Sequence, residues 1–222
     1  PAAIWSNICS STRRTSPAGA TGRFRPHQGI PIASPGRLST SPIPKQSPRR
    51  PGWSASATIV GPAGIGKSRL GNELFASTRG RATTLVGRCL AYGEGVTYWP
   101  LRGIVLSATG SLKRSGIAEF LAGAEDADRV AERLASAVGT EEGAPGGEDT
   151  FWAVRRFLEH LAHDGPVIVA IDELQWAEPT FLDLLEYLVG WTADAPILLV
   201  GLARPELLEE RPTWTTTSAR LI

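Results

Sequence analysis

A glycine-rich segment that ends in a lysine and a serine is the part of this sequence best suited to hold an anion. It reads Gly61-Pro62-Ala63-Gly64-Ile65-Gly66-Lys67-Ser68 and is followed by Arg69. Glycines let successive N–H groups turn inward around a phosphate, and a helix starting at the same place directs its positive end there. The lysine would contact the β- and γ-phosphates, and the serine hydroxyl would ligate Mg²⁺. The spacing predicts that Gly61–Arg69 bind MgATP.

Two adjacent carboxylates follow an apolar run and could act on the same nucleotide. Residues 167–171 are Val-Ile-Val-Ala-Ile, and Asp172 and Glu173 come directly after them. The first carboxylate can hold the Mg²⁺ ion through its water shell, and the second can orient or deprotonate the attacking water. Adjacent acidic residues also occur by chance where loops begin. The phosphate-binding loop upstream favours the chemical role, so we assign Asp172 to the metal and Glu173 to catalysis.

A basic residue follows a further apolar run. Residues 197–203 are Ile-Leu-Leu-Val-Gly-Leu-Ala, and Arg204-Pro205 come next. At the tip of a strand beside the one that carries Asp172, Arg204 could contact the γ-phosphate. The alternative is an exposed arginine in front of a proline that starts a turn. We predict a catalytic role for Arg204, together with Lys67.

The elements that must position these residues follow from the apolar pattern. Strands are predicted at 57–60, 83–87, 166–171 and 197–203. Helices are predicted at 67–77, 101–108, 150–162 and 179–190, and 117–138 is expected to form one or two amphipathic helices. Apolar strands that alternate with helices indicate an α/β fold with a parallel sheet covered on both faces.

The first 53 residues differ in composition from the rest. They contain nine prolines and eight basic residues without an acidic one, whereas the remainder holds 15 basic and 22 acidic residues. We expect 1–53 to be a disordered tail and 54–222 to be the folded domain. The basic residues of the tail are scattered and have no aromatic pattern among them, so no direct contact with nucleic acid is predicted.

Signals for export or membrane insertion are not found in the sequence. No apolar run approaches the roughly 18 residues of a membrane span, and the N-terminus lacks a signal-peptide core. Cys9 and Cys89 are isolated, which predicts free thiols in a reducing compartment. We therefore expect a cytoplasmic protein. Because the sequence begins at Pro1 and contains no Met, we also expect a fragment or a processed product.

Four segments in order resemble a known family. They read GPAGIGKSRL, GRCLAYGEGVTYWPL, VIVAIDELQWAEPTFLDLLEYL and LLVGLARPELLEERPTW. Together they look like the AAA-type ATPase module of bacterial STAND regulators, over about residues 55–214. In such regulators the module adjoins a nucleotide cyclase domain, a LuxR-type DNA-binding domain or TPR-like repeats.

The resemblance implies a P-loop NTPase fold, a three-layer α/β/α sandwich with strand order 5-1-4-3-2. The fifth strand and the lid would be missing here. It also implies an ATP-driven change in assembly state, and the same roles for Lys67, Ser68, Asp172, Glu173 and Arg204. The family usually carries an acidic helical segment before the first strand that helps to hold the base. In this chain the first acidic residue is Glu73.

The family pattern also includes aromatic residues, and the sequence leaves more than one function open. Trp176 and Tyr98-Trp99-Pro100 are interpreted as packing residues, and His160 and His163 as surface histidines. A regulatory ATPase with slow turnover is the main hypothesis, and a nucleotide-binding switch or scaffold with negligible hydrolysis is the alternative. A P-loop kinase, a GTPase and a DNA-loading AAA protein are less favoured. The chain lacks the [NT]-K-x-D motif that reads guanine and shows no DNA-contacting element.

Overall fold

The three-dimensional structure is a computed structural model that describes residues 56–91, 97–141, 147–191 and 195–214. The predicted disordered tail, 1–53, lies outside the described residues. No described helix has both the length and the apolar character that a membrane span requires.

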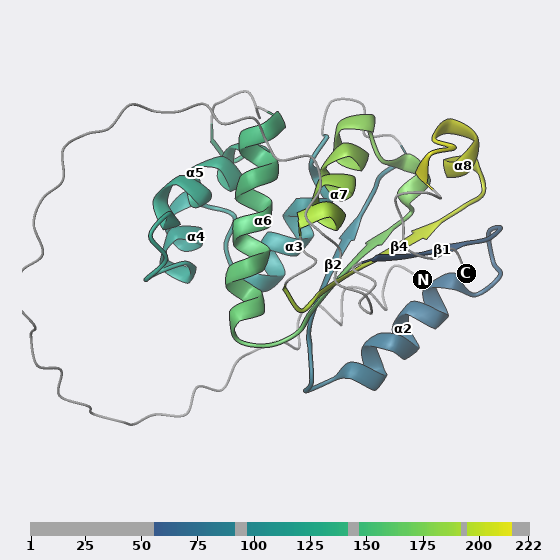
Figure 1. Cartoon of the computed structure of the whole chain (residues 1–222), viewed down its shortest axis with the longest axis horizontal. Coiled ribbons are helices and arrows are strands. Elements are labelled where there is room, and N and C mark those ends of the chain that lie inside the picture. Colours follow the sequence, from purple (N-terminus) through teal and green to yellow (C-terminus); the bar gives the residue numbers. More distant parts are fainter. Residues whose placement is uncertain (1–55, 92–96, 142–146, 192–194, 215–222) are drawn as a thin grey trace, which may run out of the picture. The chain divides into compact units, whose positions relative to one another are not determined.

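A four-stranded parallel sheet forms the centre of the described domain (Figure 1). Its strands are β1 (Ser56–Val60), β2 (Thr83–Arg88), β3 (Val167–Asp172) and β4 (Ile197–Ala203), in the order β1-β4-β3-β2. The α/β prediction is confirmed, and this order agrees with the family order for the four strands present. Because all pairs are parallel, the carboxyl ends of the strands meet at one edge.

Helices connect the strands and cover the sheet. They are α2 (Lys67–Thr78), α3 (Trp99–Thr109), α4 (Arg114–Phe120), α5 (Ala127–Ala137), α6 (Gly147–His163), α7 (Pro179–Trp191) and α8 (Glu206–Glu210), with a short 3₁₀ helix, η1 (Leu174–Trp176). The segment predicted as one or two helices is therefore two, α4 and α5. The sequence pattern did not predict η1 or α8, since three and five residues are too few to show a period.

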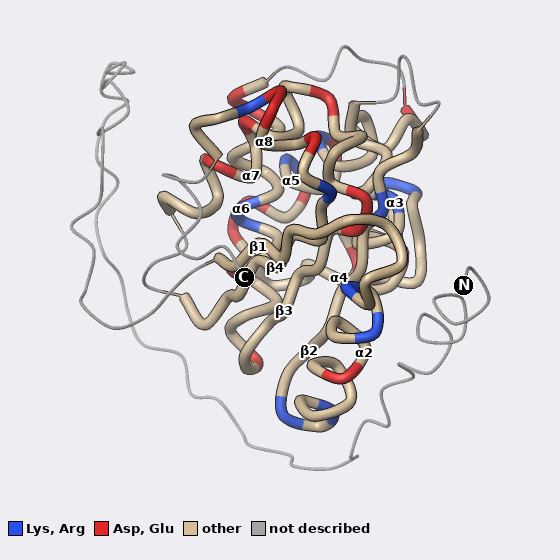
Figure 2. The backbone as a smooth tube through the Cα atoms, turned by 90° about the vertical axis from the view of Figure 1, so that its right-hand side faces the viewer, with Lys and Arg blue, Asp and Glu red and all other residues tan. Residues whose placement is uncertain are grey.

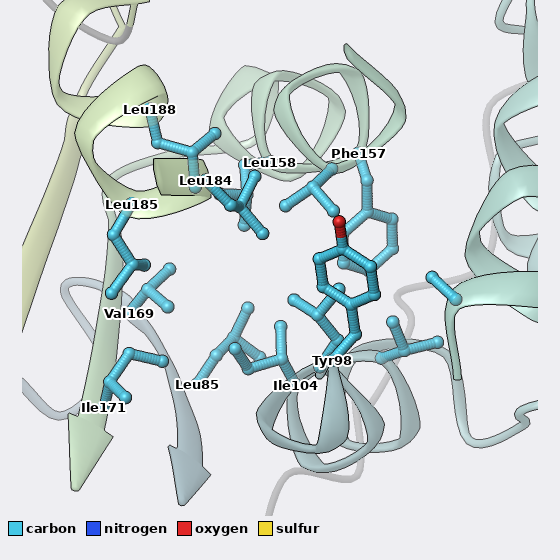
Figure 3. Close-up of a cluster of buried hydrophobic side chains, with 14 of the residues drawn as sticks. Leu85, Tyr98, Ile104, Phe157, Leu158, Val169, Ile171, Leu184, Leu185 and Leu188 are labelled. Carbon is cyan, nitrogen blue, oxygen red and sulfur yellow. The ribbon is translucent and has the colours of Figure 1, made fainter. Parts of the chain in front are cut away.

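The two faces of the sheet have different cores. On one face, Val169 and Ile171 of β3 join a large cluster of buried side chains from β2, α3, α6 and α7 (Figure 3). Alternation along a strand sends Ile168 and Ala170, which are also buried, to the opposite face. There α2 packs against β4, because a Cβ on Gly71 would lie 3.5 Å from Leu202. This arrangement is the predicted three-layer α/β/α sandwich.

Two glycines let α3 lie directly on β2. A Cβ on Gly87 would come within 2.8 Å of the Pro100 carbonyl oxygen, and one on Gly103 within 2.8 Å of the Val86 carbonyl oxygen. Real Cβ atoms do not approach backbone so closely, so larger residues would push the helix outward. The close contact fixes the start of α3 next to the carboxyl edge of the sheet.

The aromatic residues of the family pattern divide into two groups. Tyr98 is 2% exposed and Pro100 is buried, as expected of packing residues. The packing interpretation is wrong for Trp99 and Trp176, which are 38% and 45% exposed. Both tryptophans line a shallow hollow with Phe181 beside the carboxyl edge of the sheet.

Candidate phosphate and metal site

The glycine-rich segment forms the turn between β1 and α2, as its sequence predicts. Gly61 continues the sheet, with its N–H donating to the Ala203 carbonyl oxygen at 3.1 Å. Gly64 and Gly66 have φ of 82° and 105°, values that side chains disfavour, and nothing lies within 4 Å of where their Cβ atoms would be. The loop therefore leaves open space in front of its backbone and ends at the first turn of α2, which contains no acidic residue.

Lys67 is the first residue of α2, and its side chain turns back over the loop. Its Nζ donates to the Gly61 carbonyl oxygen at 2.6 Å and to the Pro62 carbonyl oxygen at 3.0 Å. Ser68 and Arg69 follow in the same helical turn and are exposed. A lysine held at the mouth of the loop can transfer its donors to a phosphate that enters it.

Asp172 ends β3 and is buried, with 6% of its surface exposed. Its Oδ1 accepts a hydrogen bond of 2.9 Å from the Glu173 N–H. Burial raises the pKa of Asp172, the hydrogen bond opposes that rise, and the charge of Glu173 adds to it. The positive charges of Arg88 and Lys67 lower the same pKa. A cation next to Asp172 would stabilise its ionised form further, which suits a metal ligand.

Glu173 has an uncommon backbone conformation and several charged neighbours. Its φ of 56° makes it the one non-glycine residue with positive φ among those described. Its carboxylate accepts a hydrogen bond of 2.5 Å from Gln175 Nε2. It also lies 3.8 Å from Arg88 Nη2 and 3.6 Å from Arg204 Nη2. Sequence reasoning placed Glu173 and Arg204 together but missed Arg88 and Gln175.

Arg204 directly follows β4, and a side chain of η1 contacts its backbone. Its N–H donates to Gln175 Oε1 at 3.0 Å, and its side chain is 33% exposed. The helix α8 that follows is tied to α7, because Arg211 Nη2 lies 3.0 Å from Glu186 Oε2 and also pairs with Asp183. Figure 2 shows acidic residues along both helices. Because β1, β3 and β4 are parallel, the structure brings Lys67, Asp172, Glu173 and Arg204 to the same edge of the sheet.

A family profile described as AAA ATPase domain matches residues 46–200. The chain belongs to this family. An uncharacterized protein of Rhizobium meliloti (strain 1021) is 32% identical over 183 residues, which is 72% of this chain and 17% of that protein. The chain thus spans about a sixth of the length of this relative. Membership in the AAA ATPase family implies that the domain binds a nucleotide, typically with Mg²⁺.

The residues at this edge of the AAA domain fit that ligand. Open space in front of Gly64 and Gly66 leaves their backbone accessible to a phosphate, and burial raises the pKa of Asp172, an effect that a bound cation would oppose. Within the described ranges no three His, Cys, Asp or Glu side chains gather as a metal group. Mg²⁺ does not need such a group, because it keeps several waters and is bound through one or two protein ligands plus phosphates.

His160 and His163 lie elsewhere in the AAA domain. His163 is exposed at the end of α6, and His160 is partly buried with its ring edge-on to Phe120, 5.7 Å between centroids. Both line a hollow between α5 and α6 in which Arg156 bonds Asp126 at 2.6 Å. These contacts give His160 a packing role that the surface interpretation did not include.

Cys89 lies beside the carboxylates and is buried. It is 4% exposed, and its N–H donates to the Asp172 carbonyl oxygen at 3.0 Å. Burial raises the pKa of its thiol from 9.0 to about 12, and the charges of Asp172 and Glu173 add to the rise. A raised pKa favours the protonated native state, so its stabilising effect is full below pH 9 and is lost as the pH rises toward 12.

We expect slow alkylation of Cys89 in the native protein. In a Cys9→Ser variant Cys89 is the remaining cysteine, and at pH 8 the raised pKa lowers its thiolate fraction ~10³-fold relative to the denatured chain. The rate of iodoacetamide labelling, followed by mass spectrometry with and without denaturant, measures this directly. Equal rates in both conditions would show that the thiol is exposed in the native state.

Proposed function

We propose that this AAA domain binds MgATP, hydrolyses it slowly and acts as a nucleotide-dependent switch in a multidomain STAND-type signalling or transcriptional regulator. The observation that supports this most is the meeting of the phosphate-binding loop, an acidic pair and an arginine at one sheet edge. In the proposal Gly61–Arg69 hold the phosphates, and Ser68 and Asp172 hold Mg²⁺. Bound Mg²⁺ would neutralise charge that develops on the phosphates.

Each proposed catalytic side chain has a partner that it would exchange for the nucleotide. Lys67 would leave the Gly61 and Pro62 carbonyl oxygens for the phosphates. Arg204, now 3.6 Å from Glu173, would turn to the γ-phosphate, and this would leave the Glu173 carboxylate freer to orient water. Binding of the triphosphate and preparation of the water-orienting group would thus be coupled.

The role of the domain in a larger protein is also proposed. The chain matches 17% of its Rhizobium relative, which leaves room for further domains in proteins of that kind. Flanking cyclase, LuxR-type or repeat domains, and a nucleotide-dependent oligomer, would convert the state of the nucleotide into a signal in the cytoplasm. The tail, 1–53, is proposed to lie outside the folded domain, 54–222.

A switch with negligible hydrolysis is the second candidate. One observation favours it: the Glu173 carboxylate already contacts Gln175, Arg88 and Arg204, and contacts that persisted with nucleotide bound would compete with its orientation of water. Two measurements separate the candidates, the stoichiometry of nucleotide that co-purifies with the protein and the steady-state release of phosphate. Release above background supports hydrolysis, whereas near-stoichiometric nucleotide without release supports the switch.

Ser68→Ala tests the proposed metal ligand. The hydroxyl is expected to contribute to binding only when Mg²⁺ is present, so its removal should make ATP binding less dependent on Mg²⁺. Titration calorimetry with ATP, with Mg²⁺ or with EDTA, gives the ratio of the two affinities for each protein. Ser77→Ala, at the far end of α2, is the matched control because its hydroxyl donates to the Leu74 carbonyl oxygen, within its own helix. A ratio equal to that of the parent would exclude Ser68 as a metal ligand.

A further inference from the structure

Gln175 carries a buried amide that lies between Glu173 and Arg204 of the proposed site. It is 5% exposed, and a buried amide must be hydrogen-bonded to avoid a large desolvation cost. Its two ends are used differently. Nε2 donates to Glu173 Oε2 at 2.5 Å, and Oε1 accepts from the Arg204 N–H at 3.0 Å. One side chain thus connects the residue after β3 to the residue after β4.

The backbone around Gln175 is fixed by its neighbours. The turn that contains Gln175 is η1, and the Trp176 N–H closes it by donating to the Glu173 carbonyl oxygen at 2.9 Å. Leu174 is 0% exposed, and its Cδ2 would be 3.0 Å from a Cβ on Gly201 of β4. With Leu174 packed onto β4 on one side of Gln175, the amide has little freedom to leave its two partners.

We propose that Gln175 is a positioning residue that holds the Glu173 carboxylate at a fixed place relative to the tip of β4. This inference depends on the proposed role of Glu173 in hydrolysis. The two arginines near Glu173 cannot replace Gln175, because they lie at 3.6 and 3.8 Å and their side chains are 33% and 49% exposed. Partly exposed pairs at such distances restrict a side chain much less than a short hydrogen bond from a buried amide does.

The chemistry of the amide explains why a glutamine suits this place. Glutamine offers a donor at one atom and an acceptor at the other. Leucine would provide neither and would leave the Arg204 N–H without its partner. Glutamate would keep an acceptor for that N–H but would put a second negative charge against Glu173. The two substitutions therefore separate the contact with Glu173 from the contact with Arg204.

The test measures single-turnover cleavage of MgATP, with protein in excess, for the parent, Gln175→Leu and Gln175→Glu. Both variants are expected to cleave ~10–100-fold more slowly, because a small displacement of a catalytic group has effects of that size. Their MgATP affinity should stay within about threefold of the parent. Parent-like cleavage by Gln175→Glu would overturn the proposal, since only the Arg204 contact would then matter.

A double-mutant cycle asks whether Gln175 acts through Glu173. If it does, Glu173→Gln/Gln175→Leu is no slower than Glu173→Gln alone, whereas multiplied effects would overturn the proposal. Thr150→Val is the matched control for loss of a buried polar group. Thr150 is 1% exposed on α6, and its hydroxyl has no hydrogen-bond partner in the described part of the chain. The control is expected to cleave at the parent rate.

A second readout does not need hydrolysis. The ¹⁵N side-chain amide resonance of Gln175 is assigned by its loss in Gln175→Leu, and it should move in Glu173→Gln but not in Thr150→Val. An unmoved resonance would overturn the proposal whatever the kinetics show. A parent chain without cleavage would instead refute the proposed hydrolysis, and the resonance would still decide whether Gln175 holds Glu173.

Discussion

Glu173→Gln is expected to bind MgATP about as tightly as the parent and to cleave it ~10²-fold or more slowly. Glutamine keeps the size of the side chain and most of its hydrogen bonding but removes the charge that polarises the attacking water. Asp172 would still hold the metal, and Lys67 the phosphates. Affinity from calorimetry and the single-turnover rate, measured on the same preparation, therefore separate binding from turnover.

The measurement on Glu173→Gln needs protein in excess over ATP and a control variant away from the site. An arginine supplied by a neighbouring subunit is worth ~10³–10⁵ in related phosphoryl transfers, so slow cleavage must be measured with protein in excess over ATP. Glu132→Gln is the matched control, because Glu132 lies on α5 and forms an exposed pair with Arg114 at 3.5 Å. Equal rates for parent and Glu173→Gln, both above background, would remove Glu173 from catalysis. Background rates in both would favour the switch without turnover.

Lys67→Ala is expected to weaken MgATP binding by about 10–100-fold. The loss of one charge-assisted contact costs about 1.5–3 kcal/mol. The measured loss should fall in the lower part of that range, because Lys67 must first give up its bonds to the Gly61 and Pro62 carbonyl oxygens. Titration calorimetry measures the affinity, and Lys113→Ala removes an exposed lysine before α4 as the control. An unchanged affinity would be incompatible with the phosphate-binding role of Lys67.

The strands and the loop were predictable because their signals are local. The apolar runs at 166–171 and 197–203 agree with β3 and β4 to within one residue, since strands buried on both faces need apolar side chains throughout. The phosphate-binding loop was recognised from the spacing of its glycines and Lys67. For the same reason Asp172, Glu173 and Arg204 could be placed at strand tips before the fold was known.

Side-chain contacts between residues on neighbouring strands could not be predicted from the local sequence pattern. Arg88 meets Glu173 because β2 lies beside β3 with Arg88 opposite Asp172. The family order, in which strands 2 and 3 are neighbours, could have indicated this pair. Gln175 contacts Arg204 because η1 turns its side chain toward the end of β4. A helix of three residues is too short to show a period in the sequence. The exposure of Trp99 and Trp176 also depends on tertiary packing, which composition does not report.

The position of β1 has a consequence for how the chain folds as it is made. Among the described strands β1 pairs only with β4, and Ser56 lies opposite Leu199, more than 140 residues later. Synthesis proceeds from the N-terminus, so β1 leaves the ribosome long before its partner exists. The phosphate-binding loop is then bounded by an unpaired strand until the segment of β4 has emerged. We therefore expect the nascent chain to acquire affinity for nucleotide late, after β2 and β3 can already pair with each other.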